Sequence, residues 1–165
     1  MNLKKVKELS FILLYLYKDN IVYKIASLPI KIIIAQNDVL YRRALKDFLQ
    51  EDPGFKVIGE TKDGKTAVSL AKELDPDVII IDLELPVIAG EITIRKIKKE
   101  KPSIKIMALT SHENQDEAME ALDAGANAYV NKDIDMKYLK MIIETVNKGA
   151  VWISPLIGRK GLSGS

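Results

Sequence analysis

The chain has 165 residues, of which 47% are hydrophobic and 29% are charged, so it can bury the core of one domain and is not intrinsically disordered. It contains no cysteine, which excludes disulfides, thiol catalysis and cysteine-ligated metal sites. The formal net charge is +2, but five of the lysines lie in residues 1–30 and the remainder is nearly balanced, so the main body offers no broad basic surface for nucleic acid.

Residues 1–29 form an apolar and basic extension. The run Phe11–Tyr17 follows three lysines and is too short to span a bilayer. Polar residues 18–20 interrupt the apolar pattern, and the cleavage pattern of a secretory signal peptide near Ala26 is poor. We interpret the extension as an amphipathic helix or as a leader from an early start codon, and both alternatives stay open.

From Ile30 onward, apolar runs of strand type alternate with segments of helical spacing. Short β-branched runs that are apolar on both faces are typical of strands buried in a parallel sheet. The predicted strands are Ile30–Ala35, Phe55–Glu60, Asp77–Asp82, Ile104–Thr110 and Ala128–Asn131. The predicted helices contain Val39–Leu49, Ala67–Leu74, Ile92–Ile97, Ala118–Leu122 and Leu139–Val146.

Five such βα units with right-handed crossovers predict an α/β domain: a doubly wound five-stranded parallel sheet with helices on both faces. Ligands of such sheets bind at the carboxyl ends of the strands, near the topological switch point. We therefore expect functional residues just after the first, third, fourth and fifth strands. We place this domain at residues 30–154 and interpret residues 155–165 as a linker or an engineered end.

The segment Gly59–Thr66, GETKDGKT, satisfies the phosphate-loop pattern G-x-x-x-x-G-K-[ST]. In that pattern successive backbone N–H groups surround a nucleotide phosphate at a helix N-terminus. Glu60 and Asp63 would place negative charge beside the phosphates, although Asp82 could hold the magnesium ion of a nucleotide hydrolase. The plainer interpretation is a turn that leads from a strand into a surface helix. A small nucleotide hydrolase is kept as an alternative.

Three predicted strands end in, or are directly followed by, Asp82, Thr110 and Lys132, and Tyr129 stands three residues before the lysine. Their order and spacing, together with the segments DVIIIDLELP and EALDAGANAYVNKD, resemble the receiver domain of two-component response regulators. The resemblance covers residues 30–155 and implies the flavodoxin-like (βα)5 fold. Taken singly, each residue has a plainer role, as a helix cap, a solvated lysine or a core tyrosine.

The segment GAVWISP, residues 149–155, resembles the exit of receivers of the NarL/LuxR-type subgroup, in which a helix-turn-helix DNA-binding domain usually follows. The resemblance implies a regulatory domain in the cytoplasm that is not an enzyme beyond phosphoryl acceptance on its own aspartate. It implies a histidine kinase or another signalling protein as partner, a possible homodimer, and contact with DNA only through an output domain that this chain lacks. A stand-alone adaptor is the alternative.

The resemblance also implies the chemistry. Asp82 would accept a phosphoryl group, Lys132 and Thr110 would contact its oxygens, and Tyr129 would rotate as a switch. Mg²⁺ would be bound by Asp82, by two acidic residues after the first strand and by the carbonyl of Glu84. Positioning and charge neutralisation would supply the catalysis.

The chain departs from this pattern where the two acidic residues are expected, because Gln36 and Asn37 occupy their positions. Asp82 and Lys132 then balance each other without a metal, and amide oxygens offer Mg²⁺ no charge. Asp38 follows one position late and could either replace part of the lost charge or cap the first helix. We therefore expect an Asp82–Lys132 ion pair, weak or no Mg²⁺ binding, no other cofactor, and inefficient phosphorylation. A conventional phospho-accepting receiver is the alternative.

The only histidine, His112, stands among polar residues. We expect it to face solvent in a loop rather than to act as a metal ligand or a general base.

Overall fold

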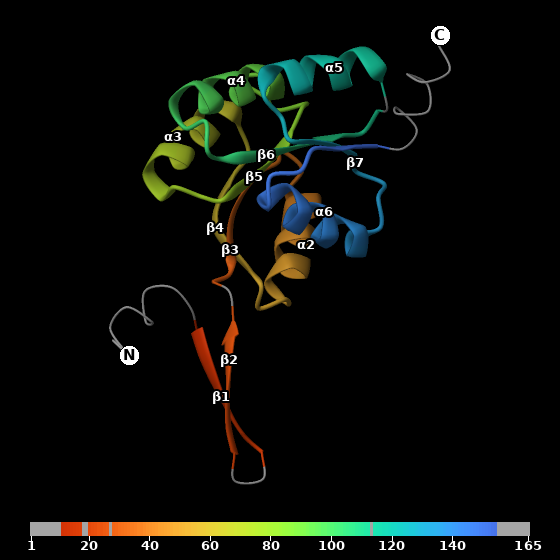
Figure 1. Ribbon diagram of the computed structural model, residues 1–165. Coiled ribbons are helices and arrows are strands. Elements are labelled where there is room, and N and C mark those ends of the chain that lie inside the picture. Colours follow the sequence, from red (N-terminus) through yellow and green to blue (C-terminus); the bar gives the residue numbers. More distant parts are fainter. Residues whose placement is uncertain (1–10, 18–19, 27, 113, 155–165) are drawn as a thin grey trace.

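The computed structural model describes residues 11–17, 20–26, 28–112 and 114–154. Strands β1 (Phe11–Tyr17) and β2 (Asn20–Ala26) pair with each other as an antiparallel hairpin. Figure 1 shows this hairpin below an α/β domain that begins at β3.

The α/β domain is built on one parallel sheet of six strands in the order β4-β3-β5-β6-β7-β8. Its strands are β3 (Ile30–Ala35), β4 (Phe55–Thr61), β5 (Val78–Asp82), β6 (Lys105–Thr110), β7 (Ala128–Asn131) and β8 (Trp152–Ile153). Its helices are α2 (Val39–Gln50), α3 (Gly64–Leu74), α4 (Gly90–Glu100), α5 (Gln115–Ala124) and α6 (Met136–Asn147). The chain turns back between β4 and β5, so the topological switch point lies between β3 and β5.

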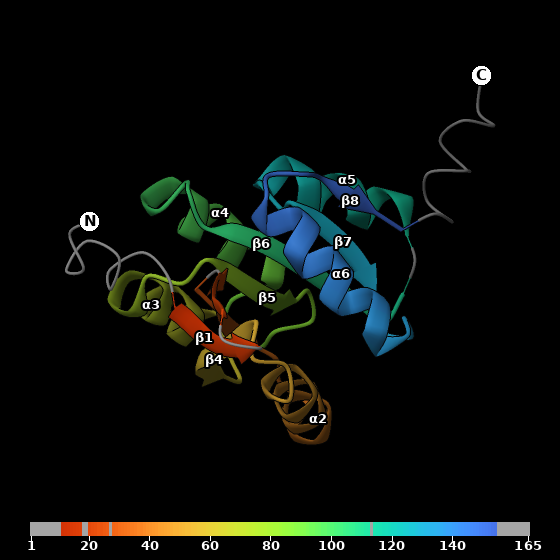
Figure 2. The ribbon, with the colours of Figure 1, turned by 60° about the horizontal axis from the view of Figure 1, so that its bottom comes forward.

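Helices cover both faces of the sheet. The odd-numbered side chains of β3 and β5 pack against α3, α4 and α5, and the even-numbered ones pack against α2 and α6. Figures 1 and 2 both place α2 and α6 on the same side of the sheet. All five residues of β5 are buried, as expected for a central parallel strand. The predicted doubly wound, flavodoxin-like α/β fold is therefore confirmed.

The prediction of five strands is wrong by one, because β8 adds a sixth strand at the edge of the sheet. Trp152 N donates to the carbonyl of Asn127 at 2.9 Å, and Ser154 N donates to the carbonyl of Tyr129 at 3.2 Å. A strand of two residues is too short to show any periodicity in a sequence.

The helix expected in the N-terminal extension is also wrong, because the described residues form β1 and β2. The two segments are rich in β-branched and aromatic residues, which favour strands over helices. Their register runs from Phe11↔Ala26 to Tyr17↔Asn20. The alternative of a leader stays untested, and the predicted linker at residues 155–165 lies outside the described residues.

Within the described residues, no helix is both long enough and apolar enough to cross a lipid bilayer.

Candidate functional site

The carboxyl edge of the sheet brings Asp82 and Lys132 together. Asp82 is the last residue of β5, Lys132 follows β7, and β6 lies between these strands. Lys132 Nζ lies 2.7 Å from Asp82 Oδ2, so the expected ion pair is present. The backbone N–H of Lys132 donates to the carbonyl of Thr110 at 2.8 Å and thereby fixes the loop that carries the lysine.

This ion pair is buried. Asp82 is 2% exposed, and its second oxygen, Oδ1, accepts the backbone N–H of Glu84 at 3.0 Å. The Lys132 side chain is 15% exposed. The folded state therefore needs both charged groups together, because a buried charge without a partner is strongly unfavourable.

Glu84 and His112 form the exposed rim beside this pair. Glu84 Oε2 lies 3.9 Å from Lys132 Nζ, and Glu84 Oε1 lies 3.2 Å from His112 Nδ1. His112 is largely exposed, as predicted. These contacts add a second, solvent-screened carboxylate to the lysine.

Gln36 lies beside Asp82 in the sheet. Strands β3 and β5 pair with Ala35 opposite Ile81, so Gln36, which directly follows β3, and Asp82, which ends β5, stand at neighbouring strand ends on the same side of the sheet. Gln36 is 1% exposed, and its Oε1 accepts the backbone N–H of Asp38 at 2.9 Å. Its amide nitrogen Nε2 is buried without a hydrogen-bond partner. The end of the Gln36 side chain therefore carries one acceptor in use and one buried donor without a partner.

Asn37 and Asp38 follow Gln36 in the loop before α2. Both residues are exposed. Asp38 caps α2, because its Oδ1 accepts the backbone N–H groups of Leu40 at 2.8 Å and Tyr41 at 3.0 Å. Of the two roles considered for Asp38, the structure shows the helix cap. The described part of the chain holds no cluster of three or more His, Asp or Glu side chains suited to a metal ion.

Tyr41 is a site residue that the sequence pattern did not reveal. Its ring, on α2, lies with its centroid 5.9 Å from Lys132 Nζ. Burial, followed by the negative charges of Asp82 and Asp133, raises the pKa of Tyr41 to about 12. The phenol therefore stays protonated, and its ring lies near the lysine of the ion pair. In the sequence, its place three residues after Asp38 is the feature that could have suggested a position near the site.

Thr110 and Tyr129 lie together, but their hydroxyls are bound on the α5 side. Thr110 Oγ1 donates to Glu117 Oε1 at 2.6 Å, and the Tyr129 hydroxyl reaches the same oxygen at 2.9 Å. Both residues are fully buried. Burial is the main cause of a raised pKa at Tyr129. Glu117 is a second residue that the sequence pattern did not reveal.

Two glycines allow neighbouring backbone to pack closely against the loop between β5 and α4. A Cβ at Gly90 would lie 2.7 Å from the carbonyl oxygen of Asp82 and 2.5 Å from Leu83 Cα. A Cβ at Gly64 would lie 2.4 Å from the carbonyl oxygen of Ile88. The backbone that follows Asp82 is therefore packed against the first residues of both α3 and α4.

The nucleotide-loop alternative for Gly59–Thr66 is wrong. Strand β4 continues to Thr61 and α3 begins at Gly64, so only two residues connect them and no phosphate-binding loop exists. Asp63 caps α3 by accepting the backbone N–H of Thr66 at 2.8 Å, and the segment is the plain turn considered above.

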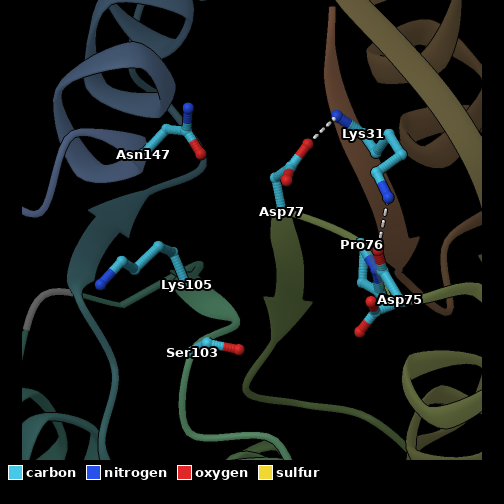
Figure 3. A pocket seen from close by; sticks show the side chains of 7 residues that line it. All are labelled: Lys31, Asp75, Pro76, Asp77, Ser103, Lys105 and Asn147. Atoms are coloured by element: carbon cyan, nitrogen blue, oxygen red, sulfur yellow. Dashed lines mark hydrogen bonds between the residues drawn. The ribbon is translucent and has the colours of Figure 1, made fainter. Parts of the chain in front are cut away.

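A cavity of about 220 Å³ lies at the opposite, amino edge of the sheet (Figure 3). Its lining residues are Lys31, Asp75, Pro76, Asp77, Ser103, Lys105 and Asn147. Asp77 Oδ2 accepts the backbone N–H of Lys31 at 2.8 Å, and Lys31 Nζ donates to the carbonyl of Asp75 at 2.8 Å. These polar groups join the starts of β3 and β5.

Comparisons with known proteins agree with this geometry. Residues 32–144 match the response regulator receiver domain family. The crystal structure of a LuxR-family two-component response regulator from Aurantimonas sp. SI85-9A1 has a TM-score of 0.76 and 29% identity, and the match covers 79% of this chain and 94% of that one.

Two curated proteins are similar in sequence. The nitrate/nitrite response regulator protein NarP of Escherichia coli is 33% identical over 122 residues, which are 74% of this chain and 57% of NarP. The transcriptional regulatory protein DegU of Brevibacillus brevis is 30% identical over 128 residues, which are 78% of this chain and 54% of DegU. The chain thus spans a little over half the length of these relatives.

Proposed function

The chain belongs to the response regulator receiver domain family, and on that premise we propose that it is an atypical receiver whose Asp82 is phosphorylated weakly or not at all with Mg²⁺. Receiver domains of two-component systems are mostly regulators rather than enzymes, and this one would catalyse at most phosphoryl acceptance on Asp82. It would work in the cytoplasm with a histidine kinase or another signalling protein as partner.

The state of Gln36 is the observation that supports this proposal. A Mg²⁺ ion needs oxygen ligands, and carboxylates also neutralise its charge. Gln36 Oε1 is occupied by the N–H of Asp38, and the free Nε2 can only donate. Asp38, the nearest carboxylate in sequence, is occupied as a helix cap. These contacts of Gln36 and Asp38 support weak Mg²⁺ binding at Asp82.

The charges at the site lead to the same proposal. Lys132 already neutralises Asp82 at 2.7 Å. Two unit charges about 4 Å apart interact by roughly 4 kcal/mol at an effective dielectric constant of 20, and each missing carboxylate removes an attraction of that order from a bound cation. Without the metal, Lys132 would have to offset the charge of an incoming phosphoryl group as well as that of Asp82. Signalling would then depend on protein contacts that stabilise one conformation of the domain.

The role in transcription is proposed from the relatives. NarP and DegU are named as regulators and are longer than the matched segment. We propose that this receiver domain regulates an output domain of a transcription regulator. That output domain would make any contact with DNA. A homodimer is a further part of this proposal.

The proposal is tested by following phosphorylation of Asp82 with acetyl phosphate while Mg²⁺ is titrated, using intact-protein mass spectrometry. We expect little phosphorylated protein at millimolar Mg²⁺. We also expect the double substitution Gln36→Asp, Asn37→Asp to restore Mg²⁺ binding and phosphorylation. Asn147→Asp, which adds a carboxylate at the opposite edge, is the matched control and should change neither.

Efficient phosphorylation of the unmodified chain would overturn the proposal in favour of a conventional receiver. If the double substitution leaves the Mg²⁺ titration unchanged, the assignment of positions 36 and 37 to the metal site is wrong.

A further inference from the structure

Glu117, in the first turn of α5, places a single carboxylate oxygen within hydrogen-bond distance of two buried hydroxyls. Thr110 Oγ1 lies 2.6 Å and the Tyr129 hydroxyl 2.9 Å from Glu117 Oε1. Both donors are fully buried, and Glu117 itself is half-buried. Hydrogen bonds to a carboxylate are shorter and stronger than those between neutral groups, which agrees with the 2.6 Å distance.

The remaining partners leave these hydroxyls fully occupied. Each hydroxyl has one proton to donate, and a carboxylate can only accept. Thr110 Oγ1 accepts the backbone N–H of His112 at 3.1 Å, and its own proton has two acceptors within reach, Glu117 Oε1 at 2.6 Å and the carbonyl of His112 at 2.9 Å, of which the carboxylate is nearer. The Tyr129 hydroxyl accepts the backbone N–H of Asn114 at 3.3 Å and donates to Glu117 or to the carbonyl of His112, which is also 2.9 Å away.

The side chains of Thr110 and Asp82 belong to opposite faces of the sheet. Thr110 alternates in phase with Ile106 and Ala108 on β6, the face that α5 covers. Asp82 alternates in phase with Ile80 on β5, the face that α2 and α6 cover. The Thr110 hydroxyl is therefore held on the α5 side of the sheet edge.

We propose that Glu117 is a positioning residue that holds the hydroxyls of Thr110 and Tyr129 together on the α5 side and so keeps Thr110 from a ligand on Asp82. Thr110 becomes available to the site only when the Glu117 carboxylate is neutralised or turned away. The inference rests on the proposed function in one respect, because it takes Thr110 as a residue that contacts such a ligand. Burial raises the pKa of Tyr129 and the contact with Glu117 raises it further, which keeps this hydroxyl protonated as a donor.

The test measures hydroxyl exchange by NMR on the whole 165-residue chain. In the unmodified protein we expect a slowly exchanging Thr110 hydroxyl proton. Glu117→Ala should abolish this signal and shift the Thr110 methyl and Tyr129 ring resonances. Glu117→Gln keeps the shape but loses the charge, and the exchange should be about tenfold faster, which corresponds to the loss of about 1.4 kcal/mol of hydrogen-bond strength.

Glu120→Gln is the matched control, since Glu120 is exposed on the same helix and its loss removes the same charge. It should leave the Thr110 signals unchanged. Unchanged exchange in both Glu117 variants would overturn the inference, and so would equal effects of Glu117→Gln and Glu120→Gln. If Glu117→Ala does not fold, the pair of glutamine variants still decides the question.

The result does not depend on phosphorylation. If the unmodified chain phosphorylates Asp82 readily and Glu117→Ala still loses the Thr110 signal, the proposed function fails and the positioning role stands. If phosphorylation is weak and the Thr110 signal survives in Glu117→Ala, the proposed function stands and the positioning role fails.

Discussion

The two ends of strand β5 carry the same kinds of charged residue but use them differently. At the amino end, Asp77 accepts a backbone N–H of Lys31, and the Lys31 ammonium donates to a backbone carbonyl. At the carboxyl end, Asp82 and Lys132 pair with each other at 2.7 Å, and Asp82 is 2% exposed. The first arrangement provides hydrogen-bond partners for backbone groups at a partly exposed edge of the sheet. The second places two opposite charges together at a buried position.

Both ends use an aspartate and a lysine, so residue type does not distinguish the candidate site from the contacts at the amino end. The burial of Asp82 and Lys132 does. A half-exposed group can exchange its protein partner for water, whereas a buried ion has no such alternative. Substitutions made in parallel at the two ends of β5 therefore test this comparison.

The largest difference is expected for the two lysines. Lys132→Met leaves the buried Asp82 without its partner and should lower the free energy of unfolding by about 3 kcal/mol or more. Lys31→Met removes a partly exposed hydrogen bond and should lower it by only about 0.5 kcal/mol. Urea denaturation measures both values. Equal losses would show that the Asp82–Lys132 pair is no more buried in solution than the contacts of Lys31.

A smaller difference is expected for two glycines. Gly90→Ala forces a methyl group against the backbone of Asp82 and Leu83 and should lower the free energy of unfolding by about 2–3 kcal/mol. Gly54, just before β4 at the amino edge, has only the flexible Asp52 side chain nearby, at 3.1 Å. Gly54→Ala should therefore lower it by less than about 1 kcal/mol. A tolerated Gly90→Ala would mean that the loop after Asp82 can shift.

The smallest difference concerns two non-glycine residues with positive φ, Val87 (φ 71°) after β5 and Asp75 (φ 48°) before it. This conformation disfavours a β-branched residue by about 1–2 kcal/mol, part of which is offset by the greater chain entropy of glycine. Val87→Gly should raise the free energy of unfolding by about 0.5 kcal/mol. Asp75→Gly should not raise it, because aspartate tolerates this conformation and the substitution removes the 3.2 Å ion pair with Lys101. Thermal unfolding of both variants checks the order.

The sequence predicted the α/β domain well because its strands are short and continuously apolar, and its helices have clear stop signals such as Gly125. It did not reveal β8, which has two residues, and it did not favour strands in the extension, where apolar spacing fits either structure. Edge pairings of this kind depend on tertiary contacts rather than on local pattern.

The candidate site was predictable where strand ends determine it. Asp82 and Lys132 meet because parallel strands end at one edge of a sheet. Glu117 and Tyr41 could not be identified in this way, because which helical side chain reaches a strand end depends on how the helix is rotated against the sheet. The unpaired nitrogen of Gln36 likewise depends on the tertiary surroundings of its side chain, which the sequence does not show.

The short edge strand β8 has a practical use for studies of this protein. It contains Trp152, the only tryptophan in the chain, and Ser154, directly after it, donates its backbone N–H to the carbonyl of Tyr129 at 3.2 Å. The indole is partly buried against the α2 and α6 side of the core. Its intrinsic fluorescence therefore provides a label-free optical signal for any displacement of the backbone that carries Tyr129.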